Sequence, residues 1–418
     1  MAFSTRKGLA AALLLCLGST VAAQDLLITN GRILDGTGGV VENGTVVVRG
    51  GRIESVSAGQ RQVPGLTVID AGGKTVMPGF VEGHRHVIEG SPATWLTERA
   101  PQQMQEFLDA GFTTVLSAID ATPIITVRDR IASGQMAGPR LFTGTFIPVA
   151  GADPEAAPAA PGDPARTDPA RLGGASKAAP AIPREALIGM IEAAKQAGYD
   201  YLKCVVNTTP GGPEIETLKF IVEEGRKRDL PTIVHAVSVK DAAAVIDAHP
   251  AMLVHTPHIG RLDQDAAALQ KIAGAGIPMT STLAVFVPHF NGAGAALFRD
   301  RLPFPWDTLS SAGQGPVNAR LLWEAGITYG YGTDTQWPPR QSLADELRAL
   351  SLVFSPQEIV RILTANAAAA TLHGNEFGTL TPGKLADIVI VAGDPLADSA
   401  ALLNVETTIK EGKVVFRK

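Results

Sequence analysis

The stretch Val76-Met-Pro-Gly-Phe-Val-Glu-Gly-His-Arg-His86 decides how this chain is interpreted. An apolar run, which we expect to form a strand over residues 76–81, leads into His84 and His86. In a β-strand the side chains of residues i and i+2 point to the same side, so both imidazoles can reach one metal ion. The pair alone is weak evidence, because a surface strand can carry two histidines by coincidence. A metal site therefore requires further ligands elsewhere in the chain.

The middle of the chain alternates short apolar runs with amphipathic helical patterns. We expect helices over residues 184–197, 214–227, 240–248 and 264–275. We expect strands to end near His86, Ile119, Ile147, Val206, Ala236, His255, Leu283 and Asp334. This alternation predicts an α/β fold with a parallel sheet. Eight strands are the number of a (β/α)8 TIM barrel, which places its chemistry at the carboxyl ends of the strands.

The two ends of the chain differ from this middle. Residues 25–75 and 387–416 contain short β-like runs separated by turns such as Gly50-Gly51. We therefore expect a small β-sandwich domain built from residues 24–75 and 376–418, and a barrel domain over residues 76–375. Residues 150–182 are rich in Ala, Pro and Gly without periodicity, which predicts a surface loop. Because this loop follows the third strand, a lid over the site is the alternative.

The first 23 residues are typical of a removable export signal. Arg6 and Lys7 precede an apolar run at residues 9–17, and small residues at 21–23 offer a cleavage site before Gln24. The run is shorter than the ~20 residues that span a bilayer. We expect a periplasmic or secreted protein that has no membrane association after cleavage.

Composition narrows the expected partners. Charged residues make up 18% of the 418 residues, hydrophobic residues 45%, and the formal net charge is −5, so neither nucleic acid nor an anionic membrane is indicated. After cleavage of the signal only Cys204 remains, which excludes an intrachain disulfide. We expect a small-molecule substrate.

Four more polar side chains end or interrupt apolar runs that should be buried. His235 ends the run 231–235, His255 ends 252–255 and Asp334 ends 327–334, while Lys203 lies within 201–206. An unpaired polar group in such a place is costly. A histidine satisfied by a backbone partner explains any one of these positions, but it does not readily explain all of them.

This combination resembles the amidohydrolase superfamily. Gly83-His-Arg-His86 after the first strand, Lys203 after the fourth, and Asp334 after the eighth match its pattern. Residues 378–389 likewise resemble the return of that family's chain into its small domain. The arrangement is most similar to the branch that contains imidazolonepropionase-like proteins and Xaa-Pro dipeptidases, and it also resembles bacterial amidohydrolases that hydrolyse ochratoxin A.

The resemblance implies two divalent metal ions, zinc by preference, held by six side chains. By this reading the first metal is bound by His84, His86 and Asp334, the second by His235 and His255, and an N6-carboxylated Lys203 bridges them. Carboxylation converts a cation into an anionic oxygen ligand, which suits such ions. Two metals would activate a water and polarise a carbonyl. Asp334 would be the catalytic base and then the acid.

Some positions depart from the family pattern or leave alternatives open. Glu82 stands where the family usually has Asp, which should affect support of the ligands more than the number of metals. His258 competes with His255 as a ligand, but His255 directly ends the apolar run and is preferred. We expect His258 and His289 to contact substrate. A substrate carboxylate would need a cationic partner, but Arg85, Arg261 and Arg340 are each expected to be surface arginines.

The resemblance implies an exported enzyme that cleaves the amide of N-acyl or N-aminoacyl amino acids, as a carboxypeptidase or dipeptidase does. Ochratoxin A, an N-aroyl phenylalanine, fits this reaction, and homo-oligomers are common among related barrels. A cyclic amide hydrolase of the imidazolonepropionase type is the alternative, whereas Lys203 argues against a mononuclear deaminase. An exported solute-binding protein is the non-enzymatic alternative, but binding alone gives no reason for the ligand set.

Overall fold

The computed structural model describes residues 24–150, 180–286 and 311–418. The predicted export signal, most of the predicted 150–182 loop and His289 lie outside the described residues. Within them, no helix is long and apolar enough to cross a membrane.

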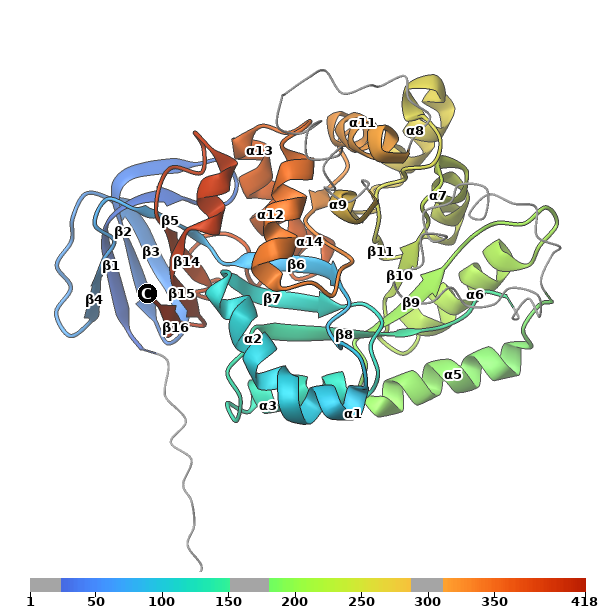
Figure 1. Cartoon of the computed structure of the whole chain (residues 1–418), viewed down its shortest axis with the longest axis horizontal. Coiled ribbons are helices and arrows are strands. Elements are labelled where there is room, and N and C mark those ends of the chain that lie inside the picture. The colour runs from blue at the N-terminus through green and yellow to red at the C-terminus, as the bar shows by residue number, and fades with distance from the viewer. Residues whose placement is uncertain (1–23, 151–179, 287–310) are drawn as a thin grey trace, which may run out of the picture.

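Eight parallel strands form the barrel in sequence order (Figure 1). They are β6 (Phe80–Arg85), β7 (Phe112–Ser117), β8 (Arg140–Phe146), β9 (Tyr201–Val205), β10 (Thr232–His235), β11 (Met252–Leu253), β12 (Met279–Thr280) and β13 (Tyr329–Gly330). The backbone N–H of Gly83 donates to the carbonyl of Tyr331 at 3.0 Å, and this bond joins the first strand to the segment after the last. A Cβ on Gly83 would lie 2.8 Å from that carbonyl oxygen, so only glycine permits the contact. The predicted (β/α)8 barrel is confirmed.

Helices lie between and around these strands. The longer ones are α2 (Ala100–Asp109), α3 (Pro123–Ala132), α5 (Arg184–Ala197), α6 (Glu214–Arg226), α7 (Val239–Val245), α8 (Ala266–Gly274), α11 (Ser311–Glu324) and α12 (Pro339–Leu350). The shorter ones are α1 (Pro92–Thr94), η1 (Trp95–Arg99), η3 (Ile246–Ala248), η4 (Leu262–Gln264), α9 (Leu283–Phe286), α13 (Pro356–Arg361), η5 (Ile362–Asn366), α14 (Ala367–Ala370) and η6 (Ser399–Leu403). The four helices expected from the sequence are all present, with ends shifted by at most three residues; the largest shift is at α7, where the 3-10 turn η3 takes the last three expected residues. Their apolar faces pack on the barrel and form its main core.

Both chain ends contribute to one separate sheet, seen as the neighbouring blue and red strands in Figure 1. It contains β1 (Leu26–Leu34), β2 (Val40–Arg49), β3 (Arg52–Ala58), β4 (Thr67–Asp70), β5 (Thr75–Pro78), β14 (Ile388–Val391), β15 (Val405–Lys410) and β16 (Lys413–Arg417). The antiparallel pairing of β14 with β5 joins the two ends. This sheet has its own apolar core, which includes Leu26, Val46 and Ile388.

The expectation of one strand over residues 76–81 is wrong. The chain changes sheets at Gly79, so that β5 belongs to the terminal sheet and β6 to the barrel. Pro78 has no backbone N–H to continue a ladder. A Cβ on Gly79 would lie 2.4 Å from Oγ1 of Thr113, so the chain passes too close to β7 for a side chain. A short apolar run thus supplies two domains.

Two other strand ends differ from expectation. Leu283 does not end a strand but begins the short helix α9, after β12 has ended at Thr280. Asp334 lies four residues beyond the end of β13 at Gly330. These differences follow from very short strands, two residues each, which apolar runs alone do not delimit.

Candidate metal centre

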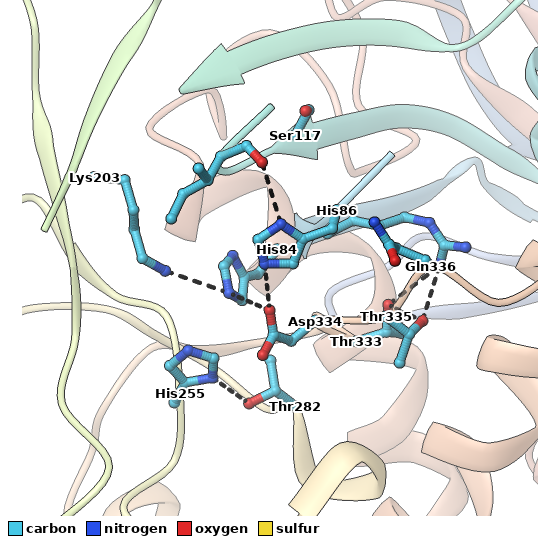
Figure 2. A network of polar contacts seen from close by, with 12 residues as sticks. His84, His86, Ser117, Lys203, His255, Thr282, Thr333, Asp334, Thr335 and Gln336 are labelled. Atoms are coloured by element: carbon cyan, nitrogen blue, oxygen red, sulfur yellow. Dashed lines mark hydrogen bonds and ion pairs between the residues drawn. The ribbon is translucent and has the colours of Figure 1, made fainter. Parts of the chain in front are cut away.

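Three side chains from the two ends of the barrel sequence meet at its carboxyl-terminal mouth (Figure 2). Oδ1 of Asp334 lies 3.1 Å from Nε2 of His84 and 2.9 Å from Nε2 of His86. Both histidines project from the end of β6 on the same side, as the alternation of a strand requires. The structure therefore brings together the first three residues that the sequence indicated.

Asp334 is held by its backbone as well as by its side chain. Its φ of 54° lies in the left-handed region, which aspartate tolerates better than most residues. Its backbone N–H donates to the carbonyl of His84 at 2.8 Å. This bond sets the carboxylate directly above the end of β6.

The other predicted ligands surround the same point. Nζ of Lys203 lies 3.4 Å from Nε2 of His84. The ring of His255 lies 4.8 Å from that of His84 and 4.4 Å from that of His235, measured between centroids. All six side chains predicted from the sequence thus form one connected cluster.

Burial sets the charge of these groups. It lowers the pKa of His84 and of His235 to about 3, with the nearby Lys203 acting in the same direction. Burial also lowers the pKa of Lys203 to about 7. Although burial would raise the pKa of Asp334, its histidine neighbours hold that pKa well below the usual range. The cluster therefore offers a carboxylate and three neutral imidazoles, those of His84, His235 and His255, in the forms that bind metal ions, whereas Asp334 outweighs burial and raises the pKa of His86.

The orientation of His86 depends on the segment after β7, which sequence reasoning missed. Nδ1 of His86 lies 3.2 Å from the carbonyl oxygen of Ile119, so that Nδ1 carries the proton and Nε2 faces Asp334. The next residue, Asp120, accepts the backbone N–H groups of Val87 at 2.7 Å and Ile88 at 3.1 Å. These contacts fix the backbone that carries His86. Asp120 directly follows a predicted strand, and that position was the only feature of the sequence that could have indicated its role.

Glu82 supports the ligands from below, as the sequence suggested. Its Oε1 accepts the backbone N–H groups of His84 at 3.1 Å and Thr333 at 3.0 Å, and its Oε2 accepts the Thr333 hydroxyl at 2.9 Å. Burial raises the pKa of Glu82 to about 7. One buried carboxylate therefore ties β6 to the residue that precedes Asp334.

Arg85 is not a surface arginine, contrary to expectation, because it is 1% exposed. Its side chain points away from the two histidines and over the ring of Phe107, 4.9 Å from the centroid. It donates to the hydroxyls of Thr333 and Thr335, each at 3.3 Å, and to the carbonyl of Trp337. Arg85 therefore binds β6 to both flanks of Asp334, and no feature of the sequence indicated these partners.

A second buried carboxylate acts on His255 through an intermediate residue. Nδ1 of His255 lies 2.9 Å from Oγ1 of Thr282. Glu346 on α12 accepts the backbone N–H groups of the next two residues, Leu283 at 2.9 Å and Ala284 at 2.7 Å. The carboxylate thus caps the first turn of α9 and fixes Thr282 beside the imidazole.

The remaining sequence candidates differ in their placement. His258 is 3% exposed, its backbone N–H donates to the carbonyl of Val237 at 2.9 Å, and its side chain lies close enough to His235 to lower the pKa of that imidazole. Burial lowers the pKa of His258 to about 4. Arg261 pairs with Asp263 at 2.6 Å, and Arg340 is exposed. His289 lies outside the described residues, so its expected contact with substrate stays a prediction.

The donor set fits a divalent metal. Ligand atoms of His84, His255 and Asp334 all lie within 4.8 Å of one another. Imidazole nitrogens and a carboxylate oxygen are the donors that zinc prefers. The partners of the other ring nitrogens, Ile119 for His86 and Thr282 for His255, are of the kind that orient metal-binding histidines.

Comparison with known families decides the identity of the fold and site. The sequence model of the amidohydrolase family matches residues 75–415, which is most of the chain. The chain belongs to the amidohydrolase family. This protein is therefore a metal-dependent hydrolase that acts on C–N bonds. Its membership in a family of hydrolases excludes the alternative of a solute-binding protein.

Individual relatives agree with this assignment. Imidazolonepropionase from Shouchella clausii is 25% identical over 415 residues, which cover 90% of this chain and 86% of that protein. A crystal structure of a Xaa-Pro dipeptidase with bound methionine has a TM-score of 0.72 at 20% identity, covering 94% of this chain and 99% of the other. Ochratoxinase from A. niger has a TM-score of 0.71 at 19% identity, covering 95% and 96%. The two structures establish the shared fold alone.

Proposed function

We propose that this amidohydrolase cleaves the amide bond of N-acyl or N-aminoacyl amino acids, as a carboxypeptidase or dipeptidase does. The observation that carries the proposal is the meeting of His84, His255 and Asp334 with buried Lys203 at the barrel mouth. Xaa-Pro dipeptidase and ochratoxinase, whose structures resemble this one, both act on substrates with such an amide. Ochratoxin A, which would give phenylalanine and the isocoumarin acid, is therefore one candidate substrate.

The residues of the chain fit the proton transfers of amide hydrolysis. The reaction adds the oxygen of water to the carbonyl carbon, breaks the C–N bond and moves one proton to the leaving nitrogen. Asp334 is ionised, so it can accept a proton from water and then deliver it to that nitrogen. The bonds from the backbone of Asp334 and from His84 and His86 hold the carboxylate in one place for both transfers.

Two divalent metal ions, zinc by preference, would be held by the six clustered side chains. When bound, such ions lower the pKa of water and polarise a carbonyl oxygen. We propose that Lys203 carries an N6-carboxyl group in the loaded enzyme. This modification would replace a cation that is costly to bury, at 2% exposure, by an anionic oxygen donor.

One observation favours a second candidate substrate class. Imidazolonepropionase from Shouchella clausii aligns with 90% of this chain, and the name of that relative indicates action on a cyclic amide. Opening of a cyclic amide needs the same carboxylate and the same ligand set. Cyclic amides therefore belong in the substrate test as a competing class.

We also propose that the protein is exported and works in the periplasm or outside the cell. The charged, apolar and small-residue segments of residues 1–23 support this location. A homo-oligomer remains our expectation for the mature enzyme, on the general tendency of such barrels to assemble symmetrically.

The test compares substrate classes on the purified, zinc-supplied mature protein. N-acyl amino acids, Xaa-Pro dipeptides, ochratoxin A and cyclic amides are incubated separately, and the products are identified by mass spectrometry. The Asp334→Asn variant is the matched control. Release of a free amino acid by the wild type alone supports the proposal, whereas turnover of cyclic amides alone assigns the second candidate. No turnover in a fully metal-loaded protein would reject both.

A further inference from the structure

An exposed aromatic side chain lies at the mouth of the barrel. Phe146 is the last residue of β8 and is 45% exposed. The other large apolar side chains that are exposed in the described part of the chain are aliphatic, namely Val40, Val68, Met190, Leu372 and Val414. An aromatic ring offers a large apolar area to a bound molecule, so its position relative to the candidate metal centre matters.

The register of the strands places Phe146 on the side of the candidate metal centre. Phe146 pairs with Lys203 on β9, and residues paired in adjacent parallel strands point to the same side of a sheet. The side chain of Lys203 crosses the lumen to reach His84 on β6. Phe146 therefore faces the lumen at the same level as Lys203.

A second apolar residue extends this surface. Val205 lies two residues after Lys203 on β9, so it faces the lumen one step nearer the mouth. It pairs with His235 on β10 and is partly exposed. Phe146 and Val205 thus stand beside two of the six clustered side chains, on adjacent strands.

The opposite side of the mouth is polar. There His86 and Asp334 lie 2.9 Å apart, with Gln336 nearby (Figure 2). Gln336 is exposed and donates to the carbonyl of Ile88 at 2.8 Å. A molecule bound between the two sides would meet polar groups along β6 and apolar groups along β8 and β9. That asymmetry favours a substrate with a polar reacting group and an apolar substituent.

We infer that Phe146 and Val205 form an apolar subsite that selects a bulky apolar acyl group next to the scissile amide. This inference rests on the proposed function, and it narrows the substrate class to amides of large apolar acids. N-aroyl amino acids should therefore bind better than N-acetyl amino acids.

The test measures binding separately from hydrolysis. Zinc-loaded protein with Asp334→Asn, in which the proton transfers are blocked, is titrated calorimetrically with N-benzoylglycine and with N-acetylglycine. We expect the benzoyl compound to bind at least about tenfold more tightly, a typical selectivity of an apolar pocket. Adding Phe146→Ala should remove most of that preference and change N-acetylglycine binding less than twofold.

Two further variants sharpen the result. Val205→Thr, which is nearly isosteric, should weaken only the benzoyl compound. Met190→Ala is the control, because it removes an exposed apolar side chain on the helix α5 and not on β8 or β9. It should change neither affinity. Equal affinities for both compounds in the parent, or an unchanged ratio in Phe146→Ala, would overturn the inference.

The binding and hydrolysis results separate the two claims. Selective binding of the benzoyl compound without hydrolysis of any N-acyl amino acid by the wild type would keep the apolar subsite and reject the proposed reaction. Hydrolysis without selective binding would keep the reaction and reject the subsite.

Discussion

His86 on the first strand of the barrel and Asp334 after the last strand lie 2.9 Å apart, between Nε2 and Oδ1. The contact depends on closure of the barrel, since only closure brings these two parts of the sequence together. Three other residues hold the same seam: Gly83, Glu82 and Arg85 each bind the segment 331–337. The geometry of the candidate metal centre is therefore tied to the joint between β6 and β13.

Asp334→Asn should reduce turnover about 10²–10⁴-fold, the usual contribution of general acid–base catalysis. Asparagine tolerates the left-handed backbone at this position, so the fold should persist. Steady-state kinetics and the circular dichroism spectrum check both expectations. Turnover within tenfold of the wild type would mean that Asp334 does not transfer the proton.

Glu82→Gln should lower the free energy of unfolding by about 1–3 kcal/mol, the cost of leaving a buried polar group without its partner. The amide has one acceptor oxygen, whereas the carboxylate accepts three hydrogen bonds from His84 and Thr333. Urea unfolding measures the change. Glu98→Gln, at an exposed position, is the control and should leave the stability unchanged. An equally small effect of both variants would remove Glu82 from the support of the seam.

Arg85→Met should destabilise the protein by about 3–5 kcal/mol, the loss expected when one partner of a buried charged network is removed. It leaves Glu82 without its cationic neighbour and removes one donor from the Trp337 carbonyl, which also accepts from the Ser342 hydroxyl at 3.3 Å. Arg85→Lys should be milder, because it keeps the charge but not the forked geometry. Thermal unfolding of the two variants tests the order. A surface arginine, as first expected, would give no loss in either.

Stability should fall in acid through a link between the two domains. Arg140 on β8 binds Glu411 at 2.5 Å and Asp387 at 2.8 Å, both in the terminal sheet region. Burial raises the pKa of Glu411, but Lys410 and Arg140 outweigh it and hold that pKa below its usual value. Because the folded pKa is depressed, this contribution is present above about pH 4.5 and is lost as the pH falls through the folded pKa.

The Glu411→Gln variant isolates that contribution. Its melting temperature should lie below that of the wild type at pH 7, and the difference should shrink as the pH falls below about 4.5 and vanish below the folded pKa. Glu98→Gln serves again as the control at an exposed site. A difference that stays constant from pH 7 to pH 3 would show that the charge of Glu411 is not the cause.

The sequence predicted the six clustered side chains better than the residues that hold them in place. His84, His235 and Lys203 could be identified because each interrupts or ends an apolar run where a polar group has no local reason to occur. Arginine is usually found at the surface, so the sequence did not predict that Arg85 is buried. Its hydrogen-bond partners come close only when the barrel closes. Glu346 positions Thr282, the partner of His255, by accepting two backbone N–H groups of another helix. A contact between distant elements leaves no periodic pattern in the sequence.

For the fold, the sequence likewise predicted the architecture but not the local details. The alternation of strands and helices predicted the barrel, because each element has to bury one apolar face. The change of sheet at Gly79 could not be predicted, since it depends on the close approach of Thr113 from β7. The two-residue strands β12 and β13 are likewise defined by their neighbours more than by their own residues.

Metal dependence of hydrolysis is the central claim, and one measurement tests it most directly. The metal content of the purified enzyme is determined by mass spectrometry while its hydrolysis rate is followed through chelation and zinc addition. We expect two metal ions per chain, loss of activity in parallel with loss of metal, and recovery with zinc. Full activity in a protein stripped of metal would contradict the account.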